Sequence, residues 1–431
     1  MVMTEGTQSE QIEKDRVLLI GVNTGEEDYD HAIDELKSLV EACNMEVVGI
    51  ITQNMEAINK ALYIGTGKVL EVREFAEERG ANLVICEETL SPSQLRNLQE
   101  ELDLPIMDRT NLILDIFSNR AKSREAKLQV EVARLKYMLP RLVGLHDALS
   151  RQGGASGSLS SKGAGEKKLE LDKRRIEHRI AELSRELEGL TKERATQRQK
   201  RMNSRVPQVA LAGYTNAGKS TLMNALVDVY VKDEEKKVLE KDMLFATLET
   251  SVRRIDNGRK KPFYLADTVG FIHKLPTGLV KAFRSTLEEI KYADLILEVV
   301  DYSDPNYKKH IQVTEDTLRE LGAGEIPVLY VYNKSDLVEK QIPYISGNKI
   351  FMSAKTKTGV EELVQIITET LYENNQETAF LIPYDKGQIV SYLCENAEVL
   401  EQNYIDSGVY LVVHCHQNDI NKYKQFIVDR M

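Results

Sequence analysis

Residues 213–220, GYTNAGKS, carry the residue types of a phosphate-binding loop. Gly213 and Gly218 let the backbone curl so that successive amides point at phosphate oxygens. Lys219 would place a point charge near the β- and γ-phosphates, and the Ser220 hydroxyl can ligate magnesium. The spacing G-x-x-x-x-G-K-[ST] follows the apolar run QVALAG and precedes a predicted helix, which is the context that the motif requires. The predicted nucleotide contacts of this loop are Gly213, Tyr214, Thr215, Asn216, Ala217, Gly218, Lys219, Ser220 and Thr221.

Residues 333–336, NKSD, indicate which base is bound. They follow the apolar run VLYVY, and Asp336 can accept hydrogen bonds from the N1 and N2 donors that guanine has and adenine lacks. An adenine would leave a desolvated carboxylate unpaired, and this penalty favours guanine. Asn333 is expected to tie the segment to the phosphate loop, and the stem of Lys334 to cover the base. The predicted base contacts are Asn333, Lys334, Ser335 and Asp336, together with Ser353, Ala354 and Lys355 of SAK, where a backbone amide would face the guanine O6.

Two stretches between these motifs are predicted to hold magnesium and to contact the γ-phosphate. DTVG (267–270) follows FYLA, so Asp267 can hold Mg²⁺ through water and the Gly270 amide can contact the γ-phosphate. In LFATLE (244–249), Thr247 could close over the nucleotide and give the metal a second hydroxyl. The predicted metal ligands are Ser220, Thr247 and Asp267, and the predicted catalytic groups are Lys219, Thr247 and Gly270. The remaining predicted nucleotide contacts are Phe245, Ala246, Leu248, Glu249, Thr268 and Val269.

Phe271 follows Gly270, at the position where many GTPases have a glutamine that orients the attacking water. A phenyl ring can neither accept a proton nor hold a water, so intrinsic hydrolysis is expected to be slow. The deficit must be met by charge on the β–γ bridge or by groups from a partner. Asn216 matches the asparagine of GTPases that resemble the potassium-activated group, and it would then help to hold K⁺ against the phosphates. Alternatively, Asn216 only stabilises the turn of the loop.

The motifs lie in a chain whose patterning predicts four parts. Residues 1–110 and 206–373 alternate short apolar runs with amphipathic stretches, which predicts α/β structure with parallel strands. The fold class is therefore α/β, with a small N-terminal parallel α/β domain, a long antiparallel helical hairpin over 111–205, a P-loop GTPase domain with a mostly parallel sheet, and a small C-terminal α+β domain over 374–431. Ser91 followed by Pro92 predicts a helix start, as does YIGTGK (63–68), which lacks the frame of a second phosphate loop.

The hairpin prediction depends on two apolar stripes with helical spacing. These are Leu128, Val132, Leu135, Leu139 and Leu142, and then Ile176, Ile180, Leu183, Leu187 and Leu190. Between them, residues 151–166 are rich in glycine and serine, so we expect arms of about 45 Å, at 1.5 Å per residue, joined by a flexible tip. Residues 120–205 hold 22 Lys and Arg against 11 Asp and Glu, whereas the whole chain has a net charge of −11. This basic surplus favours contact with a phosphate backbone, although long helices often carry charge only as solvated surface.

Composition limits the remaining function classes. The chain has 431 residues, its net charge disfavours a general nucleic-acid binder, and no DNA partner is expected. No apolar run approaches about 18 residues, so no membrane association is expected. The four cysteines lie far apart without a C-x-x-C pair, which fits a reduced cytoplasm. We expect a monomeric, cytoplasmic protein.

Taken together, these motifs resemble the HflX family of GTPases, which associate with the large ribosomal subunit. The likeness is carried beyond the GTPase motifs by DRTNLILDIFSNRAKSREAKLQVEVARLKYMLPRL (108–142), by YIGTGKVLEV (63–72) and by KLELDKRRI (168–176) after the tip. It implies GTP hydrolysis, ribosomal RNA contact through the basic hairpin 120–205, and the splitting or rescue of stalled ribosomes under stress. The chain has GAGE (163–166) where the family usually has GPGE, and ETS (249–251) where it usually has DPT. The alternative is a GTPase scaffold that acts in ribosome assembly or on another structured RNA or protein.

Overall fold

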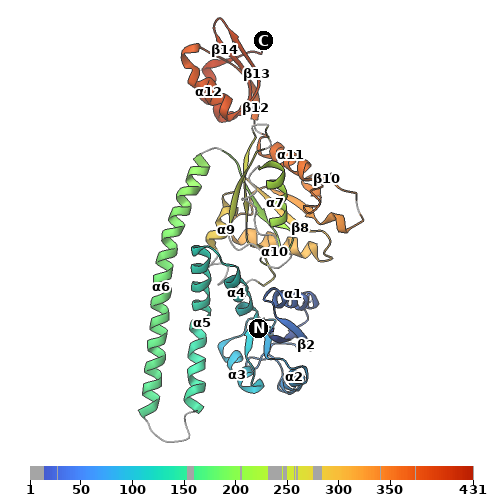
Figure 1. Cartoon of the computed structure of the whole chain (residues 1–431), viewed down its shortest axis with the longest axis vertical. Coiled ribbons are helices and arrows are strands. Elements are labelled where there is room, and N and C mark those ends of the chain that lie inside the picture. The colour runs from blue at the N-terminus through green and yellow to red at the C-terminus, as the bar shows by residue number, and fades with distance from the viewer. Residues whose placement is uncertain are drawn as a thin grey trace, which may run out of the picture. The chain divides into compact units, whose positions relative to one another are not determined.

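The computed structural model describes residues 14–26, 28–152, 160–203, 206–231, 245, 250–256, 258, 261–274, 284–339, 341–373 and 375–430 (Figure 1). The chain divides into two compact units. One comprises residues 1–191 with 274–283, and the other comprises residues 192–273 with 284–431. The predicted nucleotide contacts Ala246, Thr247, Leu248 and Glu249 lie outside the described residues.

The N-terminal sheet of the first unit is parallel throughout. Its strands β1 (Arg16–Asn23), β2 (Glu46–Asn54), β3 (Leu83–Cys86) and β4 (Ile106–Asp108) are ordered β2-β1-β3-β4. Helices α1 (Tyr29–Ala42) and α4 (Arg109–Arg120) contact each other, as do α2 (Thr66–Arg79) and α3 (Pro92–Leu102). Leu18 and Ile20 of β1 pack with Val72 of α2 and Leu98 of α3. The α/β prediction for this region is confirmed.

The helix starts predicted in this unit are present. Ser91 caps α3 through its side chain, which accepts from the Gln94 amide at 3.2 Å, while the Gln94 side chain accepts from the Ser91 amide at 2.9 Å. Gly65 is the residue before α2, which begins at Thr66. Both segments therefore serve as helix starts in the structure.

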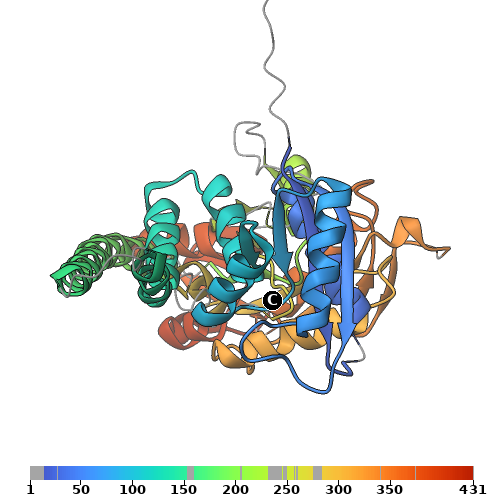
Figure 2. The ribbon, with the colours of Figure 1, turned by 90° about the horizontal axis from the view of Figure 1, so that it is seen from below.

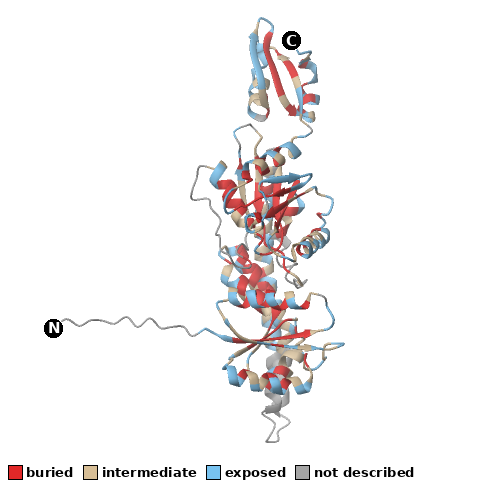
Figure 3. Cartoon of the chain, turned by 90° about the vertical axis from the view of Figure 1, so that its right-hand side faces the viewer, coloured by how far each residue is buried: buried red, intermediate tan, exposed pale blue. Residues whose placement is uncertain are grey.

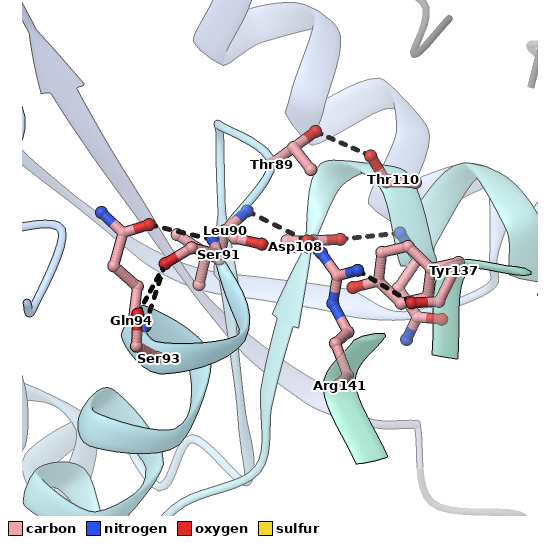
Figure 4. Close-up of polar contacts among 10 residues, drawn as sticks. Thr89, Leu90, Ser91, Ser93, Gln94, Asp108, Thr110, Tyr137 and Arg141 are labelled. Atoms are coloured by element: carbon pink, nitrogen blue, oxygen red, sulfur yellow. Dashed lines mark hydrogen bonds and ion pairs between the residues drawn. The ribbon is translucent and has the colours of Figure 1, made fainter. Parts of the chain in front are cut away.

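Asp108 joins the end of the N-terminal sheet to the following helices, as Figure 4 shows. Its fully buried carboxylate accepts from the amides of Leu90 at 3.0 Å and Asn111 at 2.8 Å. The Arg141 guanidinium lies 3.2 Å from the same carboxylate, donates to the Leu90 carbonyl at 2.6 Å and stacks on the Tyr137 ring. Because the charge is buried, paired and hydrogen-bonded, it fixes the position of the helix that carries Arg141.

That helix, α5 (Arg124–Gln152), forms the antiparallel hairpin with α6 (Ser160–Asn203), and the two lie side by side in Figures 1 and 2. The apolar stripes meet as predicted, since Leu128 and Val132 pack against Leu183. Ion pairs between Arg179 and Glu131 at 3.1 Å, and between Arg124 and Glu186, also join the helices. The helices reach further into the glycine- and serine-rich stretch than predicted, because residues 160–166 continue α6. With 29 and 44 residues, the helices extend about 43 and 66 Å.

The central sheet, in the second unit, has the order β10-β11-β9-β8-β5-β7-β6. The strands from β11 to β7 run parallel, while β10 and β6 pair antiparallel at the two edges. Its strands are β5 (Gln208–Ala212), β6 (Ser251–Ile255), β7 (Phe263–Asp267), β8 (Leu295–Asp301), β9 (Val328–Asn333), β10 (Tyr344–Ser346) and β11 (Lys349–Phe351). The described helices around it are α7 (Lys219–Tyr230), α9 (Arg284–Lys291), α10 (Tyr307–Glu320), α11 (Val360–Leu371) and the short 3₁₀ turn η2 (Ser335–Leu337). The mostly parallel sheet is as predicted, and its strands hold much of the buried core (Figure 3).

The C-terminal sheet is antiparallel in the order β13-β14-β12-β15, which confirms the predicted α+β class. Its elements are β12 (Asn375–Ile382), η3 (Tyr384–Lys386), α12 (Gly387–Asn396), β13 (Glu398–Ile405), β14 (Gly408–His416), α13 (Gln417–Lys422), η4 (Lys424–Phe426) and β15 (Ile427–Val428). Sequence patterning did not predict β13, because most of its residues are exposed and its letters, EVLEQNYI, do not alternate apolar with polar.

Two further sequence predictions can be compared with the structure. Cys43, Cys86, Cys394 and Cys415, which lie far apart in the sequence, are all free in the structure. Within the described ranges, none of the helices combines the length and the apolar character needed to cross a membrane.

Glu298 of β8 is a buried carboxyl group in the central sheet. It is 1% exposed, and neither of its oxygens has a hydrogen-bond partner among the described residues. Burial, with a smaller contribution from the charge of Glu315, raises the pKa of Glu298 to about 8. The folded protein therefore keeps this group protonated at neutral pH.

We predict that Glu298→Gln flattens the dependence of stability on pH. The unfolded chain releases the Glu298 proton near pH 4.5 and the folded chain near pH 8, so wild-type stability should fall as the pH rises between these values. Glutamine has no proton to release, and calorimetric melting temperatures of wild type and variant should diverge from pH 5 to pH 8. The exposed Glu320→Gln on α10 is the control. Parallel melting curves for wild type and Glu298→Gln would contradict the prediction.

Candidate nucleotide-binding site

The predicted motifs follow four parallel strands of the central sheet. The phosphate loop follows β5, DTVG begins at the last residue of β7, NKSD begins at the last residue of β9, and SAK follows β11. Because the carboxyl ends of parallel strands meet at one edge, the topology brings all four motifs to the same edge of the sheet. This is the usual place for a ligand in an open α/β sheet.

Two glycines give the phosphate loop its shape. Gly213 has φ +137°, and a Cβ there would lie 2.2 Å from the carbonyl oxygen of Val299. Gly218 has φ +92°, and a Cβ there would lie 2.2 Å from the Asn333 side-chain nitrogen. No L side chain fits either position, so the loop depends on glycine at both.

Lys219 lies inside the loop, at the first turn of α7. Its ammonium donates hydrogen bonds to the carbonyl oxygens of Gly213 at 3.0 Å and Tyr214 at 2.7 Å. Burial lowers the pKa of Lys219 to about 8, opposed by the negative charge of Asp267. The buried cation therefore lies where phosphate charge would compensate it.

Ser220 and Asp267 place a hydroxyl and a carboxylate side by side. The Ser220 Oγ donates to Asp267 Oδ2 at 2.9 Å, and Asp267 is fully buried at the end of β7. Oxygen donors of these two kinds suit Mg²⁺, which is commonly held by one or two protein oxygens together with phosphates and water. The residues present therefore fit the predicted metal. The third predicted ligand, Thr247, lies outside the described residues.

Asn333 links the phosphate loop to the segments that are predicted to bind the base. Its Nδ2 donates to the Ala217 carbonyl at 2.9 Å, and its Oδ1 accepts from the Ala354 amide at 2.9 Å. One side chain thus joins NKSD, SAK and the phosphate loop. Asp336 and Lys355 are exposed, while the Lys334 ammonium lies 2.7 Å from Asp301.

Most of the remaining predicted contacts are hydrogen-bonded within the protein or buried. The hydroxyl of Ser335 donates to the Tyr332 carbonyl at 2.8 Å, and that of Thr268 to the Leu211 carbonyl at 2.6 Å. The Ser353 hydroxyl accepts from the Thr356 amide at 3.3 Å. Val269 and Phe245 are buried, and Thr221 is half-buried on α7.

Asn216 is exposed and adopts a left-handed backbone conformation with φ +60°. Asparagine tolerates this conformation better than most residues, which gives a backbone reason for its presence in the turn. The exposed side chain is also consistent with the cation hypothesis, so the two interpretations of Asn216 both stand.

Phe271 pairs with the phosphate loop through its backbone. Its amide donates to the Gly213 carbonyl at 3.1 Å, and its carbonyl accepts from the Thr215 amide at 2.7 Å, forming a parallel bridge. Its side chain is buried, with 2% exposure. The residue that replaces the usual glutamine is therefore part of the core, and it ties the turn after Gly270 to the loop.

Tyr214 strengthens this connection in a way that sequence reasoning missed. Its hydroxyl accepts from the His273 amide at 2.8 Å, and its ring stacks on that of His310 with centroids 3.9 Å apart. His310 is buried on α10, almost 100 residues further along the chain. The sequence gives no signal for this stack, because neither residue belongs to a motif that requires the other.

These features define a class of protein. A strand, a phosphate loop and a helix, with DTVG and NKSD at the same sheet edge, form the nucleotide site of a P-loop GTPase. Comparison with family models agrees along the chain. Residues 30–118 match "GTP-binding GTPase N-terminal", residues 120–201 match "GTP-binding GTPase Middle Region", and residues 208–334 match "50S ribosome-binding GTPase".

Curated relatives give the family. The GTPase HflX of Caldanaerobacter subterraneus is 44% identical over 96% of this chain and 94% of its own length. The GTPase HflX of Lacrimispora saccharolytica is 41% identical over 95% of both chains, and that of Escherichia coli is 39% identical over 83% of both. The chain belongs to the HflX family of GTPases and is a GTP-hydrolysing enzyme. A crystal structure of a GTP-binding protein from Sulfolobus solfataricus in complex with GDP is 26% identical, with 84% of this chain and 99% of that chain covered and a TM-score of 0.43.

We predict that nucleotide binding takes up protons between pH 7 and 9. In the free protein the pKa of Lys219 is about 8, and phosphate oxygens beside the ammonium would raise it. GDP affinity should therefore fall as the pH rises through 8, approaching about tenfold per pH unit above it. Titration calorimetry in two buffers with different ionisation enthalpies measures the proton uptake directly. An affinity that is constant from pH 7 to pH 9, without proton uptake, would contradict the role given to Lys219.

Proposed function

We propose that this chain is a GTP-dependent factor that binds the large ribosomal subunit and splits or rescues stalled ribosomes. GTP and GDP bind at the edge of the central sheet, through the residues predicted from GYTNAGKS, LFATLE, DTVG, NKSD and SAK. Mg²⁺ is held there by Ser220, Thr247 and Asp267. The observation that carries the ribosome proposal is the basic helical hairpin within a chain of this family.

The hairpin supports contact with ribosomal RNA through its charge and exposure. Residues 120–205 carry twice as many basic as acidic residues, while the chain as a whole is acidic. The side chains of Arg174 and Arg175 are 69% and 79% exposed on α6, and their acidic neighbours Glu170 and Asp172 lie on the same helix. An exposed guanidinium group can donate two parallel hydrogen bonds to one phosphate group, so exposed arginines on a helix are well suited to contact a phosphate backbone.

The rigid base of the hairpin supports a mechanical role. The paired leucine stripes and the ion pairs between α5 and α6 keep the helices together, and Arg141 attaches α5 to Asp108. An arm held in this way can transmit force to the site where its tip lies. The four-part division at residues 110, 205 and 373 then separates the arm from the GTPase domain that binds the nucleotide.

The second candidate is a GTPase that acts in ribosome assembly, and the same arm favours it because immature subunits also expose RNA. We further propose that the protein works as a monomer in the cytoplasm, where ribosomes and GTP are available.

Gradient sedimentation separates these functions. The full chain is mixed with large subunits or with intact ribosomes, in the presence of GDP or of a non-hydrolysable GTP analogue. Splitting requires that intact ribosomes dissociate when the analogue is bound. Binding to subunits without dissociation of intact ribosomes would favour assembly, and the absence of binding in every nucleotide state would reject both.

We predict that reversing the exposed charge on α6 weakens binding to the large subunit. The double variant Arg174→Glu and Arg175→Glu should reduce the affinity for the large subunit. The plot of log affinity against log salt should also become less steep by about two, which is near one for each phosphate that the arm no longer neutralises. The double variant Lys308→Glu and Lys309→Glu, at two exposed positions of α10, is the matched control for reversal of two charges elsewhere. Thermal melting checks that the variants fold. Unchanged salt dependence in the double variant would show that these arginines do not bind RNA.

We also predict that potassium accelerates GTP hydrolysis relative to sodium at equal ionic strength. The expected cause is a cation held against the phosphates by the Asn216 side-chain oxygen. Asn216→Gly removes the side-chain oxygen without straining the loop, because glycine tolerates φ +60°. Asn216→Ala removes the same oxygen and adds backbone strain. Both variants should lose the difference between the two salts. Equal rates for the wild type in KCl and NaCl would leave the turn role of Asn216 as the explanation.

A further inference from the structure

The hydroxyl of Thr215, in the phosphate loop, is a buried polar group without a partner among the described residues. The residue is 6% exposed, and its Oγ1 makes no hydrogen bond within that part of the chain. Buried hydroxyl groups are nearly always hydrogen-bonded, because an unsatisfied one loses its bonds to water without replacement. An exception inside a binding loop needs an explanation.

Thr215 lies where the loop, the DTVG turn and the buried lysine converge. A Cβ placed at Gly270 would lie 2.9 Å from Thr215 Cα, 3.0 Å from Thr215 Cγ2 and 2.8 Å from Lys219 Nζ. Lys219 is the residue of this motif that reaches the β- and γ-phosphates. Thr215 and Lys219 therefore both lie close to Gly270, whose amide is predicted to contact the γ-phosphate, so the unpartnered hydroxyl belongs to a residue beside the predicted γ-phosphate position.

The backbone of Thr215 leaves its side chain as the available donor. Its amide already donates to the Phe271 carbonyl at 2.7 Å. The Phe271 ring, at the position of the usual glutamine, is buried and has no polar atom. A hydroxyl at residue 215 can supply a polar contact that residue 271 cannot.

We propose that the Thr215 hydroxyl donates a hydrogen bond to an oxygen of the γ-phosphoryl group, and that it thereby distinguishes GTP from GDP. The inference rests on the nucleotide site described under the proposed function. A donor to a charged phosphoryl oxygen gains strength in a buried site, and it would strengthen further as charge develops during hydrolysis. GDP has no γ-phosphoryl group and gains nothing from it.

The experiment measures the affinities of the full chain for GDP and for a non-hydrolysable GTP analogue by fluorescence titration. Thr215→Val keeps the shape of the side chain and removes the hydroxyl, whereas Thr215→Ser keeps the hydroxyl. Thr215→Val should weaken binding of the analogue by about tenfold or more, the effect of losing a hydrogen bond to a charged group, while GDP affinity stays within about twofold. Thr215→Ser should preserve the wild-type ratio of the two affinities.

Thermal melting without nucleotide provides an independent readout. Replacing an unsatisfied hydroxyl by a methyl group should leave the melting temperature unchanged or raise it. A lower melting temperature together with equal weakening of both nucleotides would mean that the hydroxyl has a structural role, and unchanged binding of both would mean that it touches no phosphate. Either result overturns the inference.

Two controls keep the test decisive. If Thr215→Val does not fold, Thr215→Ser and Thr215→Ala repeat the comparison of hydroxyl with no hydroxyl, now without the γ-methyl group. Failure of the wild type to bind either nucleotide would reject the site itself, and Lys219→Ala provides the reference for a site that no longer binds. If GDP binds normally and Thr215→Val does not change the affinity for the analogue, the role of the Thr215 hydroxyl is rejected while the nucleotide site stands.

Discussion

Two backbone hydrogen bonds between Phe271 and the phosphate loop are the constraint on which the nucleotide site depends. They use the Gly213 carbonyl and the Thr215 amide. They therefore fix the start of the phosphate loop against the turn that follows Gly270. Backbone pairing of this kind is insensitive to the side chain at residue 271, which can then serve the core. The close approach of Gly270 to Thr215 and Lys219 follows directly, and it explains why residue 270 has no side chain.

Much of this site was predictable because its residues obey local rules. A phosphate loop must join a strand to a helix, and parallel strands bring their carboxyl ends to one edge, so the sequence could predict that the four short motifs lie together at one edge of the sheet. The hairpin was predictable for a similar reason, since Leu128 and Val132 on one helix, and Leu183 and Leu187 on the other, recur with the period of a helix. Regular periodicity is a property of the sequence itself.

What the sequence could not reveal depends on contacts between distant residues. The stack of Tyr214 on His310 and the bridge made by Asn333 to Ala217 and Ala354 arise only when separate elements pack. Strand β13 lacks the usual alternation because little of it is buried. Helix α6 begins at Ser160 although the glycines that follow have a low helix propensity. Burial of Glu298 without a hydrogen-bond partner among the described residues is equally invisible to patterning.

The apolar residue at position 271 is consistent with the architecture around it. A glutamine amide in the same buried place would need partners for its donors and its acceptor, and the amide and carbonyl of residue 271 are already paired with the Gly213 carbonyl and the Thr215 amide. Phenylalanine meets the packing requirement without that cost. The side chain at residue 271 then supplies no polar group to the γ-phosphate, so the polar contacts must come from the phosphate loop, from the predicted groups Thr247 and the Gly270 amide, or from a partner. In this chain, the turn after DTVG positions the loop, and the chemistry depends on what the loop presents.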